Sequence, residues 1–267
     1  MRHPTNRPSF GPRWAVLAVL ALLGAGAAGA ATLTDSATET YRLGPEGSIA
    51  LRTTNGDILV SVWDRPEVQV ETLRKVTASS EARARELLDG LRSEERQDGE
   101  RLEITARLPR TGGWGSVFGV SSASITYVVS IPAATAVEAR STNGDVTIEG
   151  AERRVHARTT NGQVRLREVA GEIEASTTNG GVIAELVDPV TAASLSTTNG
   201  RVRLTVAEGV GIDLDARAVN GRVRVDVPIR HESQDRRGKS VRGELWGGGA
   251  PVSVRTVNGS ISVQESR

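Results

Sequence analysis

The chain has 267 residues, with 33 lysines and arginines, 32 aspartates and glutamates, and no cysteine. This charge balance excludes the strong basic excess typical of a dedicated nucleic-acid binder. The lack of cysteine excludes stabilisation by disulfides and lipidation on an N-terminal cysteine. Only 3% of the residues are aromatic and 29 are glycine, so we expect a thin core of small aliphatic side chains.

Residues 1–31 have the order of features typical of a secretory signal peptide. Three arginines precede the apolar stretch WAVLAVLALL at residues 14–23, and the small residues GAGAAGAA follow it. The uncharged run of residues 14–31 also just reaches the length of an uncleaved membrane anchor. Cleavage would remove three arginines and no acidic residue, leaving 30 basic and 32 acidic residues. We therefore expect an exported protein that is periplasmic, surface-located or secreted, with membrane contact only through an uncleaved signal.

After a lead-in at residues 32–47, an Asn-Gly motif occurs for the first time and then recurs six times, each copy preceded by Thr or Val. Successive asparagines are separated by 88, 18, 18, 20, 21 and 38 residues. A period near 20 residues is typical of a solenoid, in which each unit stacks on its neighbours. The predicted repeat turns are Asn55, Gly56, Asn143, Gly144, Asn161, Gly162, Asn179, Gly180, Asn199, Gly200, Asn220, Gly221, Asn258 and Gly259.

Apolar and polar residues alternate on both sides of every motif. Val155, Ala157 and Thr159 precede one turn in this way, and Val164 and Leu166 follow it. This period of two predicts half-buried strands, and glycine allows the positive φ of a sharp corner. The fold class predicted for residues 48–265 is an all-β, single-domain β-solenoid (β-helix-like) with rungs of about 18–21 residues. The competing fold is a barrel or propeller of antiparallel hairpins, but 18 residues leave no room for a second reversal.

Stacked rungs would bring equivalent side chains together. We expect the asparagines to form a hydrogen-bonded ladder along the axis, and the threonine before each asparagine to form a second ladder. The last interval of 38 residues predicts two rungs, one of which lacks its Asn-Gly, with the polar run RHESQDRRGKSVRGELW at 230–246 as a bulged loop.

Residues 61–132 interrupt the period. The strand EVQVETLRKV is followed by SSEARARELLDGLRSEER, in which Ser80 is a candidate N-cap and Ala84, Leu87, Leu88 and Leu91 share a helical face. We predict one inserted α-helix near 80–96 that caps the open N-terminal end of the solenoid, because an open end exposes apolar residues and strand edges. Two further strands, RLEITARL and ITYVVSIP, flank a Gly/Ser-rich loop.

Three segments carry a resemblance to a known family. They are GSIALRTTNGDILVSVWDRPEVQVE, YVVSIPAATAVEARSTNGDVTIEG and GGGAPVSVRTVNGSISV, and they resemble the bacterial adhesin-like family of unknown function. This resemblance covers about residues 41–263 and implies an exported β-solenoid, with no catalytic residues to carry over. Four copies depart from the motif, because Gln163, Gly181, Arg201 and Arg222 replace the aspartate after glycine; only Asp57 and Asp145 could retain a cation-binding role.

Enzymatic chemistry has little support in the sequence, from which we predict a non-enzyme without catalytic residues, cofactors or metal ligands. The carboxylate pairs Asp213/Asp215 and Glu172/Glu174 would be needed for a glycan-cleaving site. Their spacing is equally that of charged residues on the solvent face of a strand, which we favour. The three histidines show no metal-ligand spacing, and there is no HExxH or GxSxG motif.

Binding surfaces are better supported. Outward positions after the turns hold Arg165, Arg201, Arg203, Arg222 and Arg224. Rungs stacked in register would align them into a stripe at about 5 Å per rung. Such a stripe would suit an anionic envelope polymer or glycan, although arginines also protect sheet edges.

A second candidate surface is the loop around Trp114 and Phe118, which would suit a protein partner. The sequence therefore leaves open an adhesin or envelope-binding module, an envelope stress-sensing or structural protein that acts through a protein partner, and, with less support, a glycan-active enzyme.

Overall fold

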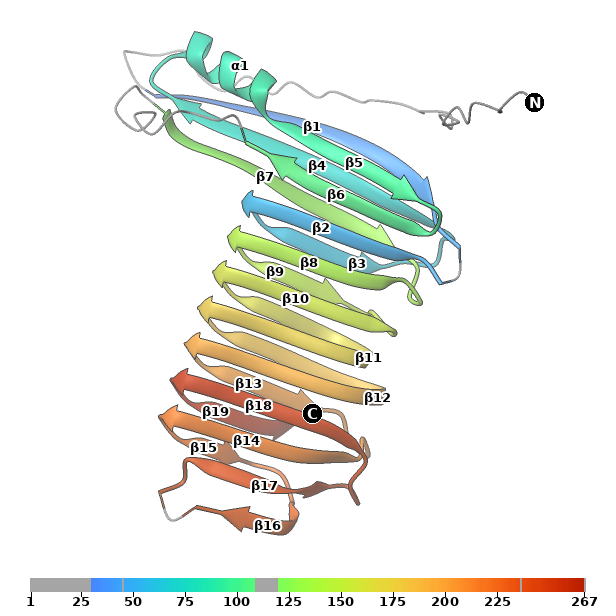
Figure 1. The fold of residues 1–267 in the computed structure, drawn as a ribbon, viewed down its shortest axis with the longest axis vertical. Coiled ribbons are helices and arrows are strands. Elements are labelled where there is room, and N and C mark those ends of the chain that lie inside the picture. Colours follow the sequence, from blue (N-terminus) through green and yellow to red (C-terminus); the bar gives the residue numbers. More distant parts are fainter. Residues whose placement is uncertain (1–29, 45, 109–119, 236, 267) are drawn as a thin grey trace, which may run out of the picture.

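The computed structural model describes residues 30–44, 46–108, 120–235 and 237–266. In these residues the chain forms one curled sheet of 19 strands and one helix. Figure 1 shows a stack of rungs, with the helix and several long strands at one end and a hairpin at the other. The expectation of an all-β, solenoid-like fold is confirmed.

The elements follow the chain in this order: β1 (Ala31–Arg42), β2 (Ser48–Asn55), β3 (Ile58–Val62), β4 (Glu67–Ala78), α1 (Glu81–Gly90), β5 (Arg92–Asp98), β6 (Arg101–Arg107), β7 (Val120–Ile131), β8 (Ala136–Asn143), β9 (Val146–Glu149), β10 (Arg154–Asn161), β11 (Val164–Asn179), β12 (Val182–Asn199), β13 (Val202–Val206), β14 (Ile212–Asn220), β15 (Val223–Val225), β16 (Arg230–Gln234), β17 (Ser240–Leu245), β18 (Ala250–Asn258) and β19 (Ile261–Glu265).

The stack has two faces, and the strands within each face pair in parallel. The first face runs β2, β8, β10, the second half of β11, the second half of β12, β18 and β14, and each of its strands ends at an asparagine. The second face runs β3, β9, the first half of β11, the first half of β12, β13, β19 and β15. The predicted inner positions of both faces, such as Val155, Ala157, Val164 and Leu166, are fully buried and build the aliphatic core.

The glycines of the Asn-Gly turns lie close to the backbone of the neighbouring rung. Gly162 has φ +153°, and a Cβ atom there would lie only 2.2 Å from the carbonyl oxygen of Gly144 in the neighbouring rung. Beside the glycines, Asn161 Nδ2 donates to Asn143 Oδ1 at 2.8 Å, and Asn179 Nδ2 donates to Asn161 Oδ1 at 2.9 Å. The ladder continues through all seven asparagines, in the order 55, 143, 161, 179, 199, 258, 220.

The hydroxyl ladder uses a different threonine from the one expected. A threonine directly precedes five of the asparagines, and it is exposed in each case, as at Thr160 and Thr178. The buried threonine two residues before the asparagine donates to a glycine carbonyl of the adjacent rung instead: Thr159 to Gly144 at 2.8 Å and Thr177 to Gly162 at 3.0 Å. The alternation explains this outcome, because in a strand only every second side chain faces inward.

The N-terminal end is covered by α1 and the long antiparallel strands β1, β4 and β7. Ser80 caps the helix, and Ala84, Leu87 and Leu88 are buried. The predicted helix near 80–96 is too long, since it ends at Gly90 and residues 92–98 form β5, which pairs with β6. Strand pairing prevails there because an antiparallel neighbour is available one tight turn later, at Gly99 (φ +55°).

The C-terminal rungs do not stack in chain order. The interval of 38 residues does not contain two rungs; it contains the antiparallel hairpin β16–β17, which pairs with the outer edge of β14. The chain then returns on the other side of β14, so that β18 lies between β12 and β14 and β19 lies between β13 and β15. The last rung in the sequence is therefore inserted between two earlier ones (Figure 1).

Tyr127 on β7 is the largest fully buried side chain among the described residues. Its hydroxyl lies 3.0 Å from Ser93 Oγ on β5. Burial raises the pKa of Tyr127 to about 12; the Ser93 hydrogen bond opposes this rise, and the nearby Glu95 carboxylate adds to it.

The glycine contact at the Asn-Gly turn predicts a large effect of Gly162→Ala. The methyl group would collide with the Gly144 carbonyl and also occupy an unfavourable φ, so we expect a loss of about 3 kcal/mol in the free energy of unfolding. Gly99→Ala is the matched control: it has positive φ but no atom within 4 Å of the new Cβ, and it should cost about 1 kcal/mol. Urea denaturation measures both, and equal losses would contradict the close-contact explanation.

Tyr127 predicts a loss of stability at alkaline pH. Between pH 10 and 12 the unfolded chain releases the phenolic proton while the folded chain keeps it, so stability falls as the pH rises through this window. The contribution of Tyr127 should be about 1 kcal/mol between pH 9 and pH 11. Tyr127→Phe removes this component and leaves that of Tyr41, whose pKa is also raised by burial and by hydrogen bonds to Glu39 and Glu95. Urea denaturation at the two pH values tests this, and parallel losses in wild type and variant would contradict it.

Candidate functional site

Four of the five predicted arginines lie close together on the outer side of the second face. Arg201 and Arg203 belong to the β13 rung, Arg222 and Arg224 belong to the β15 rung, and all four are exposed. We call them the arginine quartet. They do not form the expected stripe on consecutive rungs, because the inserted β19 lies between them and pairs Ser262 with both Arg203 and Arg224. Two strand steps separate the two pairs by about 10 Å.

Arg165, the fifth predicted arginine, lies apart from the quartet. Ile183 of β12 separates it from Arg203 in the register of the sheet. Its guanidinium is 2.7 Å from the Asp145 carboxylate, with which it forms an ion pair. Arg165 is therefore neutralised by its neighbour and is less suited to bind an anion than the quartet.

No member of the quartet forms an ion pair with any described residue. Arg201 Nε donates to the neutral Ser260 Oγ at 3.2 Å, and this is the only side-chain bond found for the quartet within the described part of the chain. Four exposed guanidinium groups without carboxylate partners make a local excess of positive charge. Such groups remain free for bidentate contacts to carboxylate, sulfate or phosphate.

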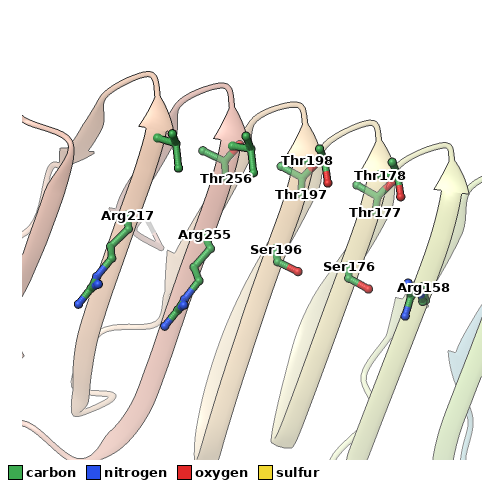
Figure 2. Close-up of a pocket in the computed structure, with 12 residues that line it drawn as sticks. Arg158, Ser176, Thr177, Thr178, Ser196, Thr197, Thr198, Arg217, Arg255 and Thr256 are labelled. Carbon is green, nitrogen blue, oxygen red and sulfur yellow. The ribbon is translucent and has the colours of Figure 1, made fainter.

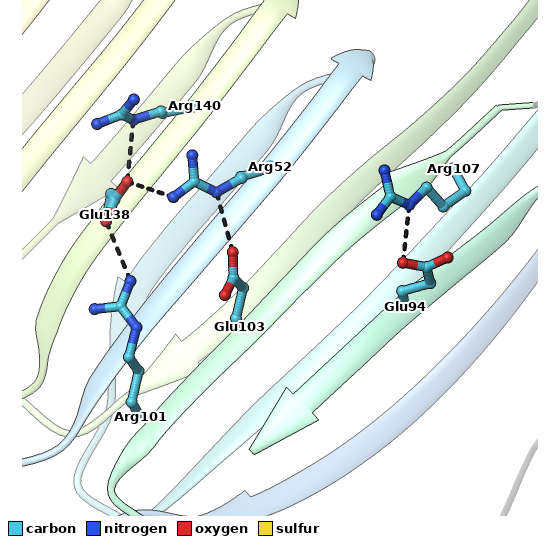
Figure 3. Close-up of polar contacts among 7 residues, drawn as sticks. All are labelled: Arg52, Glu94, Arg101, Glu103, Arg107, Glu138 and Arg140. Carbon is cyan, nitrogen blue, oxygen red and sulfur yellow. Dashed lines mark hydrogen bonds and ion pairs between the residues drawn. The ribbon is translucent and has the colours of Figure 1, made fainter. Parts of the chain in front are cut away.

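Arginines at the N-terminal end of the first face contrast with the quartet (Figure 3). Glu138 on β8 lies 2.9 Å from Arg52, 3.0 Å from Arg140 and 3.6 Å from Arg101. Arg52 also pairs with Glu103 at 3.3 Å. The Nε atoms of Arg52 and Arg140 are buried and lack hydrogen-bond geometry, so their attraction to the carboxylates is mainly Coulombic. These arginines stabilise the stack.

The candidate catalytic carboxylates are engaged in pairs. Asp215 lies 2.9 Å from Arg217 and 3.2 Å from Arg242, and Asp213 accepts a bond from the Gly249 N–H at 3.3 Å. Glu172 pairs with Arg154 at 2.9 Å, while Glu174 lies 3.7 Å from His156. These contacts agree with solvent-facing structural charges.

Asp57 and Asp145 accept hydrogen bonds from backbone N–H groups. The Asp57 carboxylate accepts the Asp145 N–H at 2.8 Å, and the Asp145 carboxylate accepts the Gln163 N–H at 2.8 Å. Within the described ranges no group of three or more His, Asp or Glu side chains is arranged to hold a metal ion.

A second basic surface lies on the first face and was not predicted. Figure 2 shows Ser176 and Ser196 side by side on β11 and β12, with Arg158 on one flank and Arg255 and Arg217 on the other. They line a shallow depression of about 410 Å³, which we call the serine trough. The sequence contains a pattern that could have predicted this surface. Each of these residues stands three positions before an asparagine, and only two rungs have serine at that position.

Residues 1–29 of the predicted signal segment and the loop with Trp114 and Phe118 lie outside the described residues. Across the described ranges, no helix has both the length and the apolar character needed to span a membrane.

The geometry defines a solenoid-like stack of in-register strands with variable outer surfaces. Residues 47–264 match the model of the Toastrack family of unknown function (Toastrack DUF4097), so the chain belongs to this family. No curated protein matches the chain.

Three solved structures are similar to this chain at low sequence identity. A crystal structure of a candidate cell adhesion protein from Clostridium sporogenes covers 86% of this chain and 100% of its own, at 10% identity and a TM-score of 0.47. A candidate adhesin from Bacteroides fragilis covers 86% of this chain and 97% of its own, at 9% identity and a TM-score of 0.36. A candidate lipid binding protein from Parabacteroides distasonis covers 87% and 97%, at 12% identity and a TM-score of 0.29.

The Glu138 network predicts a salt-sensitive loss of stability. Glu138→Gln removes the shared charge from three arginines and should lower the free energy of unfolding by about 1–2 kcal/mol, less at 1 M salt. Glu94→Gln is the control, because it removes one exposed pair with Arg107 and should change stability by less than about 0.5 kcal/mol. Urea denaturation at low and high salt measures both; equal effects of the two variants would contradict a structural role for the network.

Proposed function

We propose that this chain is a non-enzymatic, exported binding module of the bacterial cell envelope, with an adhesin-like role. The single observation that carries this proposal is the arginine quartet: four exposed arginines on the two rungs that flank β19, none with an ion pair among the described residues. The proposed ligand is an anionic envelope polymer or glycan. Membership in a family of unknown function leaves this assignment to be tested on the protein itself.

The Asn-Gly turns have a structural role in this proposal. They are proposed as the corners of successive rungs, and the asparagine ladder and glycine contacts support this view. The function would then depend on outer positions, where residue types vary from rung to rung. The paired carboxylates, which already hold arginines or backbone groups, support a non-enzymatic role.

The quartet suits an extended polymer better than a small ligand. By backbone spacing, its four Cα atoms lie about 7 Å apart along the strands and about 10 Å apart across them. Ser260 and Ser262 lie between the pairs and add hydroxyl groups without negative charge. A flexible chain with repeated acidic groups can contact several arginines at once, and exposed contacts of this kind weaken as salt screens the charges.

Export is part of the same proposal. Residues 1–31 have the pattern of a signal peptide, and the chain has no cysteine that would need a disulfide partner outside the cytoplasm. The location is proposed as periplasm, cell surface or medium.

Binding to long polygalacturonate, a carboxylate polymer, tests the proposed function. The double variant Arg203→Gln/Arg224→Gln should bind at least tenfold more weakly at low salt than the wild type, because it loses two unpaired cations. The matched control is Arg107→Gln/Arg154→Gln, which removes the same charge from two exposed, ion-paired arginines. Biolayer interferometry at 20 and 500 mM salt measures the affinities. Equal weakening in both double variants, or no binding by the wild type, would refute the role of the quartet.

A further inference from the structure

The serine trough is formed by one row of residues on the outer side of the first face. In the register of the sheet, Arg158 pairs with Ser176, Ser176 with Ser196, and Ser196 with Arg255. Arg217 follows on the next strand. Two short side chains therefore stand between long ones, and this difference in length creates the depression of about 410 Å³ seen in Figure 2.

The two arginines that flank the trough are not neutralised. Arg158 has no hydrogen bond or ion pair to any described residue, and the Arg255 Nε atom donates only to the neutral Ser253 Oγ at 3.2 Å. Arg217 is different, because Asp215 holds it at 2.9 Å. Arg158 and Arg255 are three strand steps apart, which places their Cα atoms about 14 Å from each other.

The rim toward the corners adds two other kinds of surface. Thr178 and Thr198 are exposed and offer hydroxyl groups. On the next two strands Val257 and Val219 replace threonine, and they are 41% and 57% exposed. They are two of only four large apolar side chains that are exposed in the described part of the chain. The trough thus combines two separated cations, a hydroxyl floor and a small aliphatic spot.

This combination selects among ligand classes. A nucleic acid would need aromatic side chains for stacking, and none lines the trough. A peptide that binds by adding a strand would need an unpaired strand edge, whereas the trough lies on the face of a paired sheet. A sugar ring offers hydroxyl groups for the serines and threonines and a C–H face for the valines. Acidic sugars also carry carboxylates, which arginine binds bidentately.

We propose that the serine trough binds a short acidic oligosaccharide, with one acidic group on Arg158, another on Arg255, and the sugar rings over Ser176 and Ser196. The site is distinct from the arginine quartet, which lies on the second face. It does not depend on the proposed binding of a long polymer there. Glu174, two residues before Ser176 on the same outer side, faces His156 of the neighbouring strand at 3.7 Å and limits how far an anion can extend in that direction.

Titration of the purified protein with a galacturonic acid tetramer tests the proposal, with isothermal calorimetry as the readout. Arg158→Gln/Arg255→Gln should weaken binding at least tenfold, whereas Arg107→Gln/Arg154→Gln and the quartet variant Arg203→Gln/Arg224→Gln should leave it within about twofold. The methyl-esterified tetramer should not bind.

Ser196→Arg separates shape from charge. This substitution places a long side chain in the trough and adds a positive charge. Arginine is already present at the paired position, Arg255, on the next strand. A discrete site predicts at least tenfold weaker binding of the tetramer, but nonspecific attraction predicts equal or tighter binding. Equal or tighter binding to Ser196→Arg, full competition by inorganic phosphate, or tight binding of the methyl ester would overturn the proposal. Thermal unfolding of each variant within a few degrees of the wild type confirms that the fold is intact.

Discussion

The stack depends on the contact between glycines at the Asn-Gly turns. A Cβ atom at Gly144, Gly162 or Gly180 would lie 2.1, 2.2 or 1.9 Å from the glycine carbonyl oxygen of the rung beside it. Any other residue would push the rungs apart at this edge, and the backbone bonds beside it, such as Gly162 N–H to Asn179 O at 3.0 Å, would lengthen. Because this contact fixes the register of each rung, residues at equivalent positions become neighbours along the axis.

Because the strands stack in register, the residues at one position of the repeat form a row along the axis of the stack. Inner rows tolerate little variation, since they hold the aliphatic core and the threonines that bond to glycine carbonyls. Outer rows face water and can change their chemistry from one rung to the next. Arg52 and Arg140, at one end of a row, are neutralised by Glu138, whereas Arg158 and Arg255 of the same row have no acidic partner in the part of the chain that the structure describes. The neutralising carboxylate of Glu138 comes from the adjacent outer row, two residues earlier on the same strand as Arg140.

Sequence reasoning reached the local structure more fully than the order of the rungs. Alternation before and after each Asn-Gly predicts which side chains are buried, because a strand places every second residue on the same side. The end of the helix at Gly90 was missed, since the exposed segment 92–98 carries no apolar alternation and becomes a strand only through its pairing with β6. The serine trough was missed for a related reason. Ser176 and Ser196 can be recognised as the floor of a binding site only when the strand order shows that Arg255 is the next residue in their row.

The inserted rung changes the electrostatics of both faces. In chain order, the β13 and β15 rungs would be neighbours, and Arg203 would lie about 5 Å from Arg224 by backbone spacing. Two unit charges at that distance in water repel by about 0.8 kcal/mol, and at about 10 Å by about 0.4 kcal/mol. Insertion of β19, with Ser260 and Ser262 on its outer side, produces the larger separation. On the first face the same insertion places Arg255, which has no acidic partner among the described residues, beside Ser196. Chain order would instead have placed Arg217 there, and Asp215 already neutralises it. One change in strand order thus lowers the repulsion among arginines on one face and leaves an unpaired arginine at the edge of the trough on the other.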